Sequence, residues 1–163
     1  IPGLYGSVSG TSFITADADA GLCCFKGDHM VGGGYQMTIA TNGAKDIYFC
    51  NQGDVQRVPF GVDKLFAVGV ETLGLGAPAG ELCTYTKAIP GETYAFGPGN
   101  FSTIVTTTNK YATVSNGYLV GSSSAPSAAG TIYFELDAAL GIDVFTEANY
   151  GAFSRYNLLC RKV

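Results

Sequence analysis

The sequence predicts an all-β fold, an antiparallel β-barrel or β-sandwich with an extended N-terminal arm and at most one short helix. Two Asn-Gly pairs, Asn42-Gly43 and Asn116-Gly117, stand between runs rich in apolar and β-forming residues. Asn-Gly in this setting is a strong hairpin signal, because both residues tolerate the positive φ of a type I′ turn. No long segment repeats apolar residues with the 3.6-residue period of an amphipathic helix.

Length and composition indicate one compact domain. The chain has 163 residues, and we expect residues 1–163 to form a single β domain. Its 23 glycines are about twice the usual share and follow no fixed period, which is typical of a fold with many tight turns. Apolar residues make up 47% of the chain and charged residues only 13%, so few charges oppose self-association. This composition favours a protein that works inside an assembly.

The N-terminal third predicts an arm followed by a hairpin. Residues 1–21 are small and polar, and we expect an extended arm with at most one strand. Residues 35–40 alternate Tyr, Met and Ile with Gln, Thr and Ala, which is the pattern of a half-buried strand. Residues 46–51 follow the Asn42-Gly43 turn, so they are expected to return as the partner strand of a hairpin.

The stretch from residue 60 to residue 91 predicts a strand, a loop and a second strand. Residues 65–70 are an uninterrupted apolar run, as in a strand buried on both faces. Residues 81–87 mix polar and apolar side chains, as in a strand with one wet face. The connector, residues 74–80, contains three glycines and a proline, which disfavour a helix.

The C-terminal half predicts further strands and one helix. Residues 101–108, FSTIVTTT, are dense in β-branched residues, and residues 131–136 form another β-rich run. Residues 121–130 are a loop by composition. The best helical candidate is residues 146–156, where Thr146 is a suitable N-cap and Glu147 stands in the first turn.

The five cysteines lack the paired C-x-x-C spacing of a zinc site. We interpret all five as buried thiols, and two disulfide bridges with one remaining thiol are the alternative. In a strand, adjacent cysteines point to opposite faces, so we expect at most one of the first two to face the core. The five are Cys23, Cys24, Cys50, Cys83 and Cys160.

No catalytic, cofactor-binding or metal site is predicted, and we expect a protein that is not an enzyme. His29 is the single histidine, and no G-x-S-x-G nucleophile elbow accompanies it. The glycines of residues 74–80 have the spacing G-x-G-x-x-x-G and precede a predicted strand, whereas a phosphate cradle requires a helix there. Residues 17–21 begin like a calcium loop, but Leu22 stands where that loop needs glycine and Asp28 where it needs glutamate.

Two further signals are weak. The 13 acidic residues leave room for a carboxylate pair of the glycosidase type, but the chain has no tryptophan to stack on a sugar ring. Asn100-Phe101-Ser102 is a glycosylation sequon, which matters only in a eukaryotic secretory route.

The charge pattern disfavours nucleic acid and membranes as partners. The net charge is −4 and the longest basic run is Arg161-Lys162, so a basic footprint for nucleic acid is missing. No apolar stretch reaches the roughly 18 to 20 residues that span a bilayer, and no basic-then-apolar leader is visible. The start at Ile1, without methionine, indicates a processed or renumbered end.

Residues 66–70, followed after a small-residue connector by residues 79–83, resemble the head-decoration (cement) proteins of tailed bacteriophages. In those small β-barrel proteins a "GVA" strand, an Ala/Gly-rich loop and a "G-E/D-x-V" strand recur. The resemblance implies a non-enzymatic virion protein, often a homotrimer, that binds the major capsid protein on the capsid surface and is assembled in the host cytoplasm. Residues 1–21 and 121–130 are the expected contact segments.

Two alternatives stay open at this point. In the first, the chain is itself a capsid or coat subunit. In the second, it is a secreted β-sandwich module that binds carbohydrate or acts as an adhesin. Disulfide bridges separate these classes, because a secreted module is expected to contain them and an intracellularly assembled virion protein is not.

Overall fold

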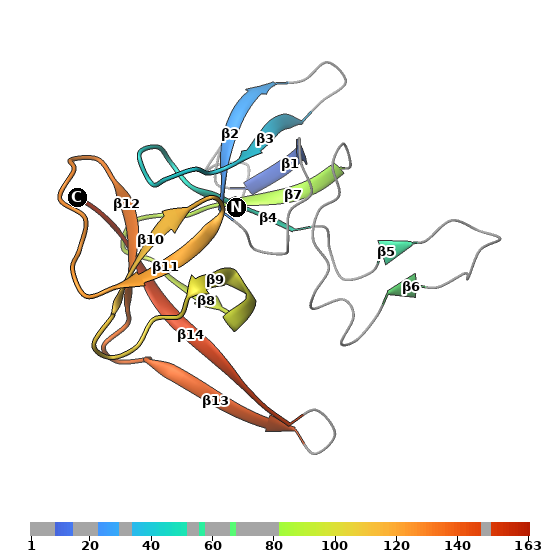
Figure 1. The fold of residues 1–163 in the computed structure, drawn as a ribbon. Coiled ribbons are helices and arrows are strands. Elements are labelled where there is room, and N and C mark those ends of the chain that lie inside the picture. The colour runs from blue at the N-terminus through green and yellow to red at the C-terminus, as the bar shows by residue number, and fades with distance from the viewer. Residues whose placement is uncertain are drawn as a thin grey trace. The chain divides into compact units, whose positions relative to one another are not determined.

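The computed structural model describes residues 9–14, 23–29, 34–51, 56–57, 66–67, 82–147 and 151–163. Within these residues the regular elements are strands, apart from one 3-10 turn, η3 (Pro98–Asn100). The predicted all-β fold class is therefore confirmed (Figure 1). The chain divides into two compact units, which we name and describe separately. The barrel unit is Ile1–Ile39 with Tyr48–Lys87, and the sheet unit is Ala40–Ile47 with Ala88–Val163.

The barrel unit is built on a closed ring of strands in the order β1-β3-β2-β4-β7. Neighbours in the ring pair antiparallel, except that β1 and β3 run parallel. Closure leaves no unpaired edge in this sheet. Two short strands, β5 (Gln56–Arg57) and β6 (Phe66–Ala67), pair with each other outside the ring. The ring strands are β1 (Ser9–Ile14), β2 (Cys23–His29), β3 (Tyr35–Ile39), β4 (Tyr48–Asn51) and β7 (Leu82–Lys87).

The strand register places an apolar and aromatic set of side chains inside this barrel. Cys24 lies opposite Ile39 and Tyr48, and Lys26 lies opposite Met37. Met37 is fully buried, whereas its neighbours along β3, Gln36 and Thr38, are exposed. The alternation read from residues 35–40 therefore matches a strand with one buried face.

Cys23 and Cys24 are adjacent in β2 and point to opposite faces, as expected, but both are buried. Cys24 points into the barrel, and Cys23 points to the outer face of β2. Phe49, the Cα partner of Cys23 on β4, is also buried, so the outer face is covered at this point too. Two adjacent cysteines are too short a pattern to show that a strand is buried on both of its faces.

The sheet unit is organised around β14 (Gly151–Lys162), a strand of 12 residues. Its first half pairs antiparallel with β13, its second half with β12, and residues 156–159 also pair with β8. Beyond β12 the sheet continues through β10, β11 and β9. The partner strands are β8 (Thr93–Phe96), β9 (Phe101–Thr103), β10 (Tyr111–Ser115), β11 (Tyr118–Ser122), β12 (Ile132–Leu136) and β13 (Ile142–Glu147).

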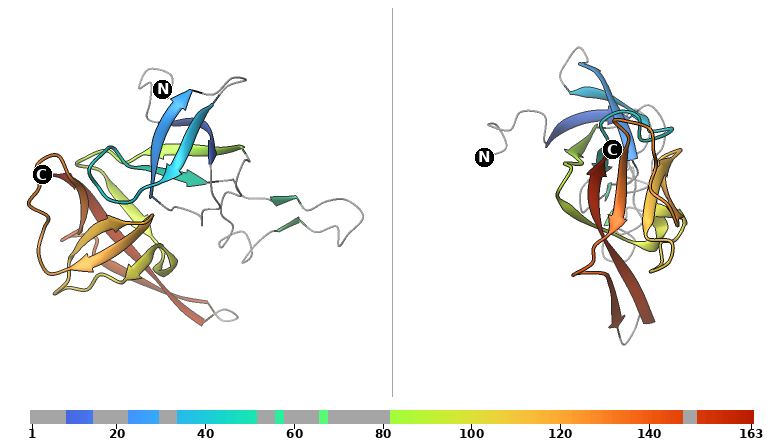
Figure 2. Two further views of the ribbon diagram at one scale, coloured as in Figure 1. Left: turned by 45° about the horizontal axis from the view of Figure 1, so that its top comes forward. Right: turned by 90° about the vertical axis from the view of Figure 1, so that its left-hand side faces the viewer.

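The core of the sheet unit gathers on β12 and β14. Phe134, Leu158 and Cys160 have no measurable exposure, and Phe134 packs edge-to-face on Phe96 with ring centroids 5.5 Å apart. Such aromatic pairs contribute about 0.5–1.5 kcal/mol beyond the burial of their area. Figure 2 shows that the β13–β14 hairpin extends away from the other strands of this unit.

One of the two predicted Asn-Gly hairpins is confirmed. Asn116 and Gly117 have φ of 49° and 84°, both positive as a type I′ turn requires, and they join β10 to β11 in one antiparallel hairpin. The matching prediction for Asn42-Gly43 is wrong, because β3 and β4 do not pair with each other in the ring. Here the Asn42 side chain accepts a hydrogen bond from Ala44 N–H at 2.9 Å, which is an Asx turn.

The helix predicted over residues 146–156 is also wrong. Thr146 ends in β13, and residues 151–156 form the first half of β14, paired along their length with β13. Residues 148–150 between them lie outside the described part of the chain. Thr146 and Glu147 favour a helix start only weakly. Gly151 disfavours a helix, and the aromatic residues that follow it favour a β-strand.

Candidate functional site

Three tyrosines and one lysine meet inside the barrel and form what we call the tyrosine cage: Lys26, Tyr35, Tyr48 and Tyr85. The Lys26 Nζ lies 3.9 Å from the ring centroid of Tyr35, 5.0 Å from that of Tyr85 and 5.6 Å from that of Tyr48. The four side chains come from four different strands, β2, β3, β4 and β7. The site therefore depends on the closed barrel rather than on a local sequence motif.

The rings stand as walls at right angles. Tyr85 meets Tyr35 at an interplanar angle of 85° and Tyr48 at 80°, with centroid distances of 6.1 Å and 5.6 Å. Tyr85 and Tyr48 are buried, whereas Tyr35 and Lys26 are half-buried. His29, at the end of β2, stacks edge-on against the outer wall, Tyr35, with ring centroids 5.1 Å apart. The cage thus has two fixed inner walls and one wall that reaches solvent.

The electrostatics of the cage favour a cation. The face of an aromatic ring carries negative charge density and attracts an ammonium within about 6 Å of its centroid. Among the described residues no carboxylate forms an ion pair with Lys26, and the three rings are the partners of its ammonium. This arrangement is therefore suited to holding positive charge.

A second group of polar side chains surrounds a hollow in the sheet unit, where β12 passes into β13. The hollow has a volume of about 430 Å³ and is lined by Thr107, Lys110 and residues 135–138, 141 and 142. Residues 138–140 bulge out of the ladder here, because Asn157 of β14 spans the gap: its C=O accepts from Asp137 N–H and its N–H donates to the C=O of Gly141.

The carboxylates that line the hollow form ion pairs or hydrogen bonds with neighbouring residues. Glu135 forms ion pairs with Lys110 at 3.4 Å and with Arg161 at 2.8 Å. Asp137 accepts the N–H groups of Leu140 and Ala139, which hold the pKa of its carboxyl below the usual value. The hollow therefore combines apolar wall residues with carboxylates that are held by ion pairs or by hydrogen bonds.

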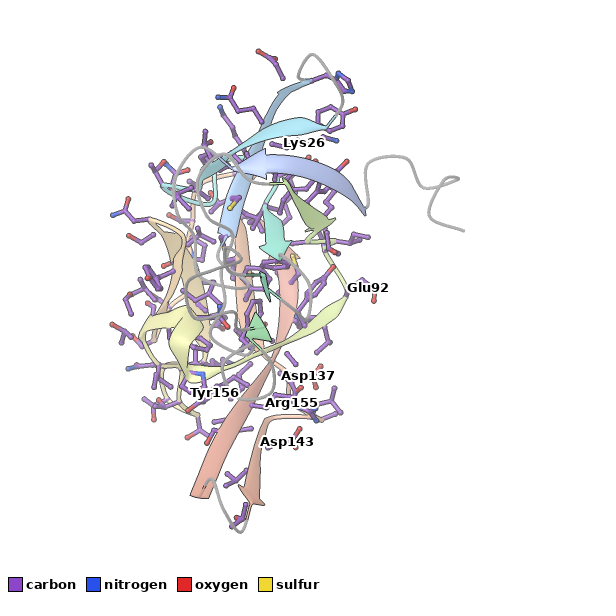
Figure 3. All side chains as sticks on the ribbon, turned by 90° about the vertical axis from the view of Figure 1, so that its right-hand side faces the viewer. Lys26, Glu92, Asp137, Asp143, Arg155 and Tyr156 are labelled. Carbon is purple, nitrogen blue, oxygen red and sulfur yellow. The ribbon has the colours of Figure 1, made fainter. Side chains whose placement is uncertain are left out.

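Asp143 ties the two strands of the protruding hairpin together. Its Oδ2 accepts from Arg155 Nη2 at 2.8 Å and from the Asn157 side-chain amide at 3.0 Å, and these bonds lower the pKa of the carboxyl. Figure 3 shows Asp137, Asp143 and Arg155 together at this end of the sheet unit. Asn157 is the one buried polar side chain among the described residues, and its second bond goes to Gly141 O.

We expect the stability of the sheet unit to fall as the pH drops below about 4, because both aspartates have folded-state pKa values below their ordinary value of 3.8. A depressed carboxyl pKa contributes stability that is fully present above the unfolded pKa and is lost as the pH falls through the folded one. In denaturant unfolding followed between pH 6 and about pH 2, Asp143→Asn should show a shallower loss than the wild type. Asp28→Asn, in the barrel unit, is the control, and equal slopes for Asp143→Asn and wild type would contradict this assignment.

The sequence positions weighed as sites have separate outcomes. His29 is an exposed strand residue that packs on Tyr35. Asn100 is half-buried in η3, and Phe101 in the middle of the sequon is buried. Residues 17–21 and 74–80, the calcium-like and fingerprint-like segments, lie outside the described residues.

The described cysteines are structural. Cys23, Cys24 and Cys160 are buried thiols, and the side chains of Cys50 and Cys83 lie outside the described set. Burial raises the pKa of the Cys160 thiol to about 12, so this thiol stays protonated and unreactive at neutral pH. In the part of the chain that is described, no group of three or more His, Cys, Asp or Glu residues is placed to hold a metal ion.

The tyrosine cage was missed by sequence reasoning. Successive members stand 9, 13 and 37 positions apart in the sequence, and no short motif joins them. The available signal was Lys26 itself, which continues the inward-facing period of the strand that contains Cys24. A lysine at an inward position of a small barrel requires partners for its charge.

Comparison with known proteins adds no relative: no protein family, curated protein or solved structure matches the chain. Among the described residues, no helix has the length and apolar character needed to span a bilayer.

Proposed function

We propose that this chain is a non-enzymatic virion structural protein. It decorates and stabilises a capsid shell by bridging neighbouring copies of the major capsid protein, and it acts as a homo-oligomer, by resemblance a trimer. The observation that carries the proposal is the protruding β13–β14 hairpin with its exposed apolar side chains. Leu140, in the turn before β13, is 57% exposed, and Ile142 and Val144, within β13, are 38% and 67% exposed.

The hairpin has the properties of a docking element. Ile142 and Val144 stand two residues apart, so both project from the same face of β13. Within the described residues β13 pairs only with β14, which leaves its other edge open to an added strand from a neighbour. The Asp143–Arg155 ion pair joins the two strands of the hairpin. The hairpin is therefore already ordered, and docking should cost little further conformational entropy.

Charge and thiol content support the same proposal. With a net charge of −4 and only 13% charged residues, the surface offers little repulsion between copies. The buried thiols Cys23, Cys24 and Cys160 suit assembly in a reducing cytoplasm, whereas a secreted adhesin module would be expected to contain bridges.

We expect Val144→Lys to weaken self-association by at least about tenfold, because a charge would be buried in the centre of the interface. The measurement is sedimentation velocity over a concentration series, with the wild type expected above monomer mass. Ile104→Lys is the matched control, since Ile104 is also an exposed β-branched apolar residue, at 42%, but lies after β9 and outside the hairpin. A wild type that stays monomeric at high concentration, or a Val144→Lys protein that associates as the wild type does, would sink the proposal.

A further inference from the structure

We propose that the tyrosine cage of the barrel unit is a binding site for small organic ammonium ions, and that Lys26 fills it as a displaceable internal occupant. The ligand class is an alkylammonium or quaternary ammonium ion of about the size of choline. This inference is independent of the assembly function proposed above, because it concerns the barrel interior and not the β13–β14 hairpin.

The walls of the cage do not depend on the lysine for their position. Tyr48 and Tyr85 are buried, with 6% and 3% exposure, and they contact each other edge-to-face. Tyr35, on β3, meets Tyr85 edge-to-face as well. Each of the three tyrosines stands on a hydrogen-bonded strand of the closed barrel. Removal of the Lys26 side chain should therefore leave three preformed walls around an empty position for a cation.

The occupant is of the kind that can leave. Lys26 is half-buried, so its ammonium has a path to solvent. No ion pair among the described residues fixes it, and its partners are ring faces at 3.9, 5.0 and 5.6 Å. Ring faces have little directional preference, so an ammonium on a free molecule can take the place of one on a side chain.

Lys26 should reduce the apparent affinity for an external ligand. A ligand that needs an open cage binds with an affinity lowered by the fraction of molecules in which the cage is open. If Lys26 occupies the cage in about nine molecules of ten, the apparent dissociation constant rises about tenfold. The site is thus closed by its own chain and opens to a competing cation.

The test uses the full chain with Lys26→Ala, which removes three methylene groups and the ammonium. Propylammonium replaces these atoms, and propan-1-ol is the neutral molecule of the same shape. Binding is followed in amide and aromatic NMR spectra. We expect propylammonium and choline to bind Lys26→Ala saturably, with shifts centred on Tyr35, Tyr48 and Tyr85, and propan-1-ol to bind at least about tenfold more weakly. Wild type should bind choline at least about tenfold more weakly than the variant.

Two matched variants locate the effect. Lys162→Ala removes an exposed lysine of β14 and should bind propylammonium no better than wild type does. Lys26→Ala combined with Tyr35→Leu removes the solvent-facing wall and should lose the binding. The proposal is overturned if Lys26→Ala shows no saturable binding, if propan-1-ol binds as well as propylammonium, or if wild type binds choline as tightly as the variant does.

Wild-type protein gives a second measurement that does not depend on the folding of a variant. Ring currents from three tyrosines should move the Lys26 Hε resonances upfield of those of Lys162. Added choline should return them toward the Lys162 position, whereas 3,3-dimethylbutan-1-ol, its uncharged carbon analogue, should not. Lys26 resonances that coincide with those of Lys162 in the absence of ligand, or that do not respond to choline, would refute internal occupancy.

Discussion

Replacing Phe134 with alanine is expected to lower the free energy of unfolding of the sheet unit by about 3–5 kcal/mol. Phe134 has no measurable exposure, packs on Phe96 with centroids 5.5 Å apart, and lies opposite Ala112 on one side and Cys160 on the other. Its small neighbours cannot fill the cavity, so the loss should be near the upper part of the range for Phe→Ala changes.

The measurement for Phe134→Ala is amide hydrogen exchange at β12 and β14, which reports the sheet unit separately from the barrel unit. Leu140→Ala is the control, because a side chain that is 57% exposed should cost less than about 0.5 kcal/mol when truncated. Exchange rates in β12 that match wild type would show that Phe134 is not the centre of this core.

Gly43→Ala is the second change with a large expected effect, about 3 kcal/mol of lost stability. A Cβ at Gly43 would lie 2.1 Å from the backbone oxygen of Ile132, far inside any real contact. The same backbones are joined by a 2.7 Å bond from Ile132 N–H to Gly43 O, which the displacement would break. Gly43 does not have a positive φ, so its backbone angles do not require glycine. Glycine is needed there because a side chain would collide with the Ile132 backbone.

Gly97→Ala tests the specificity of that result, because a Cβ there meets no atom within 4 Å and φ is −82°. We expect Gly97→Ala to change stability by less than about 1 kcal/mol, with either sign. Thermal or denaturant unfolding of both variants decides the matter. A Gly43→Ala protein as stable as Gly97→Ala would mean that the 40–47 segment does not pack on β12 as described.

The fold class followed from features that are local in sequence. The turn at Asn116-Gly117 was predictable because its two residues set the backbone angles themselves, and residues 35–40 because strand alternation has a period of two. The same dipeptide at Asn42-Gly43 misled, because there the strands on either side pair with other partners in the ring. Turn chemistry specifies an angle, whereas the partner of a strand is decided by distant segments.

The cage and the bulge could not be predicted for the same reason. Lys26 meets Tyr85 only because β2 and β7 belong to one closed ring, and Asn157 meets Asp143 only because of the offset between β12 and β13 on β14. The predicted helix at residues 146–156 failed because a capping pattern of two residues is outweighed by pairing with β13. Register is a long-range property, and every functional candidate in this protein depends on it.

The place of β14 in the sheet bears on how the chain acquires its structure during translation. β8 and β12 both leave the ribosome before β14. Among the described residues β8 pairs only with β14, and β12 has β10 on one edge but needs β14 on the other. Until β14 emerges, β8 and β12 each expose an unpaired edge, and the sheet unit is completed only by contacts between segments far apart in sequence. Stalling or truncation within β14 should therefore yield an aggregation-prone nascent chain rather than a slightly shorter native protein.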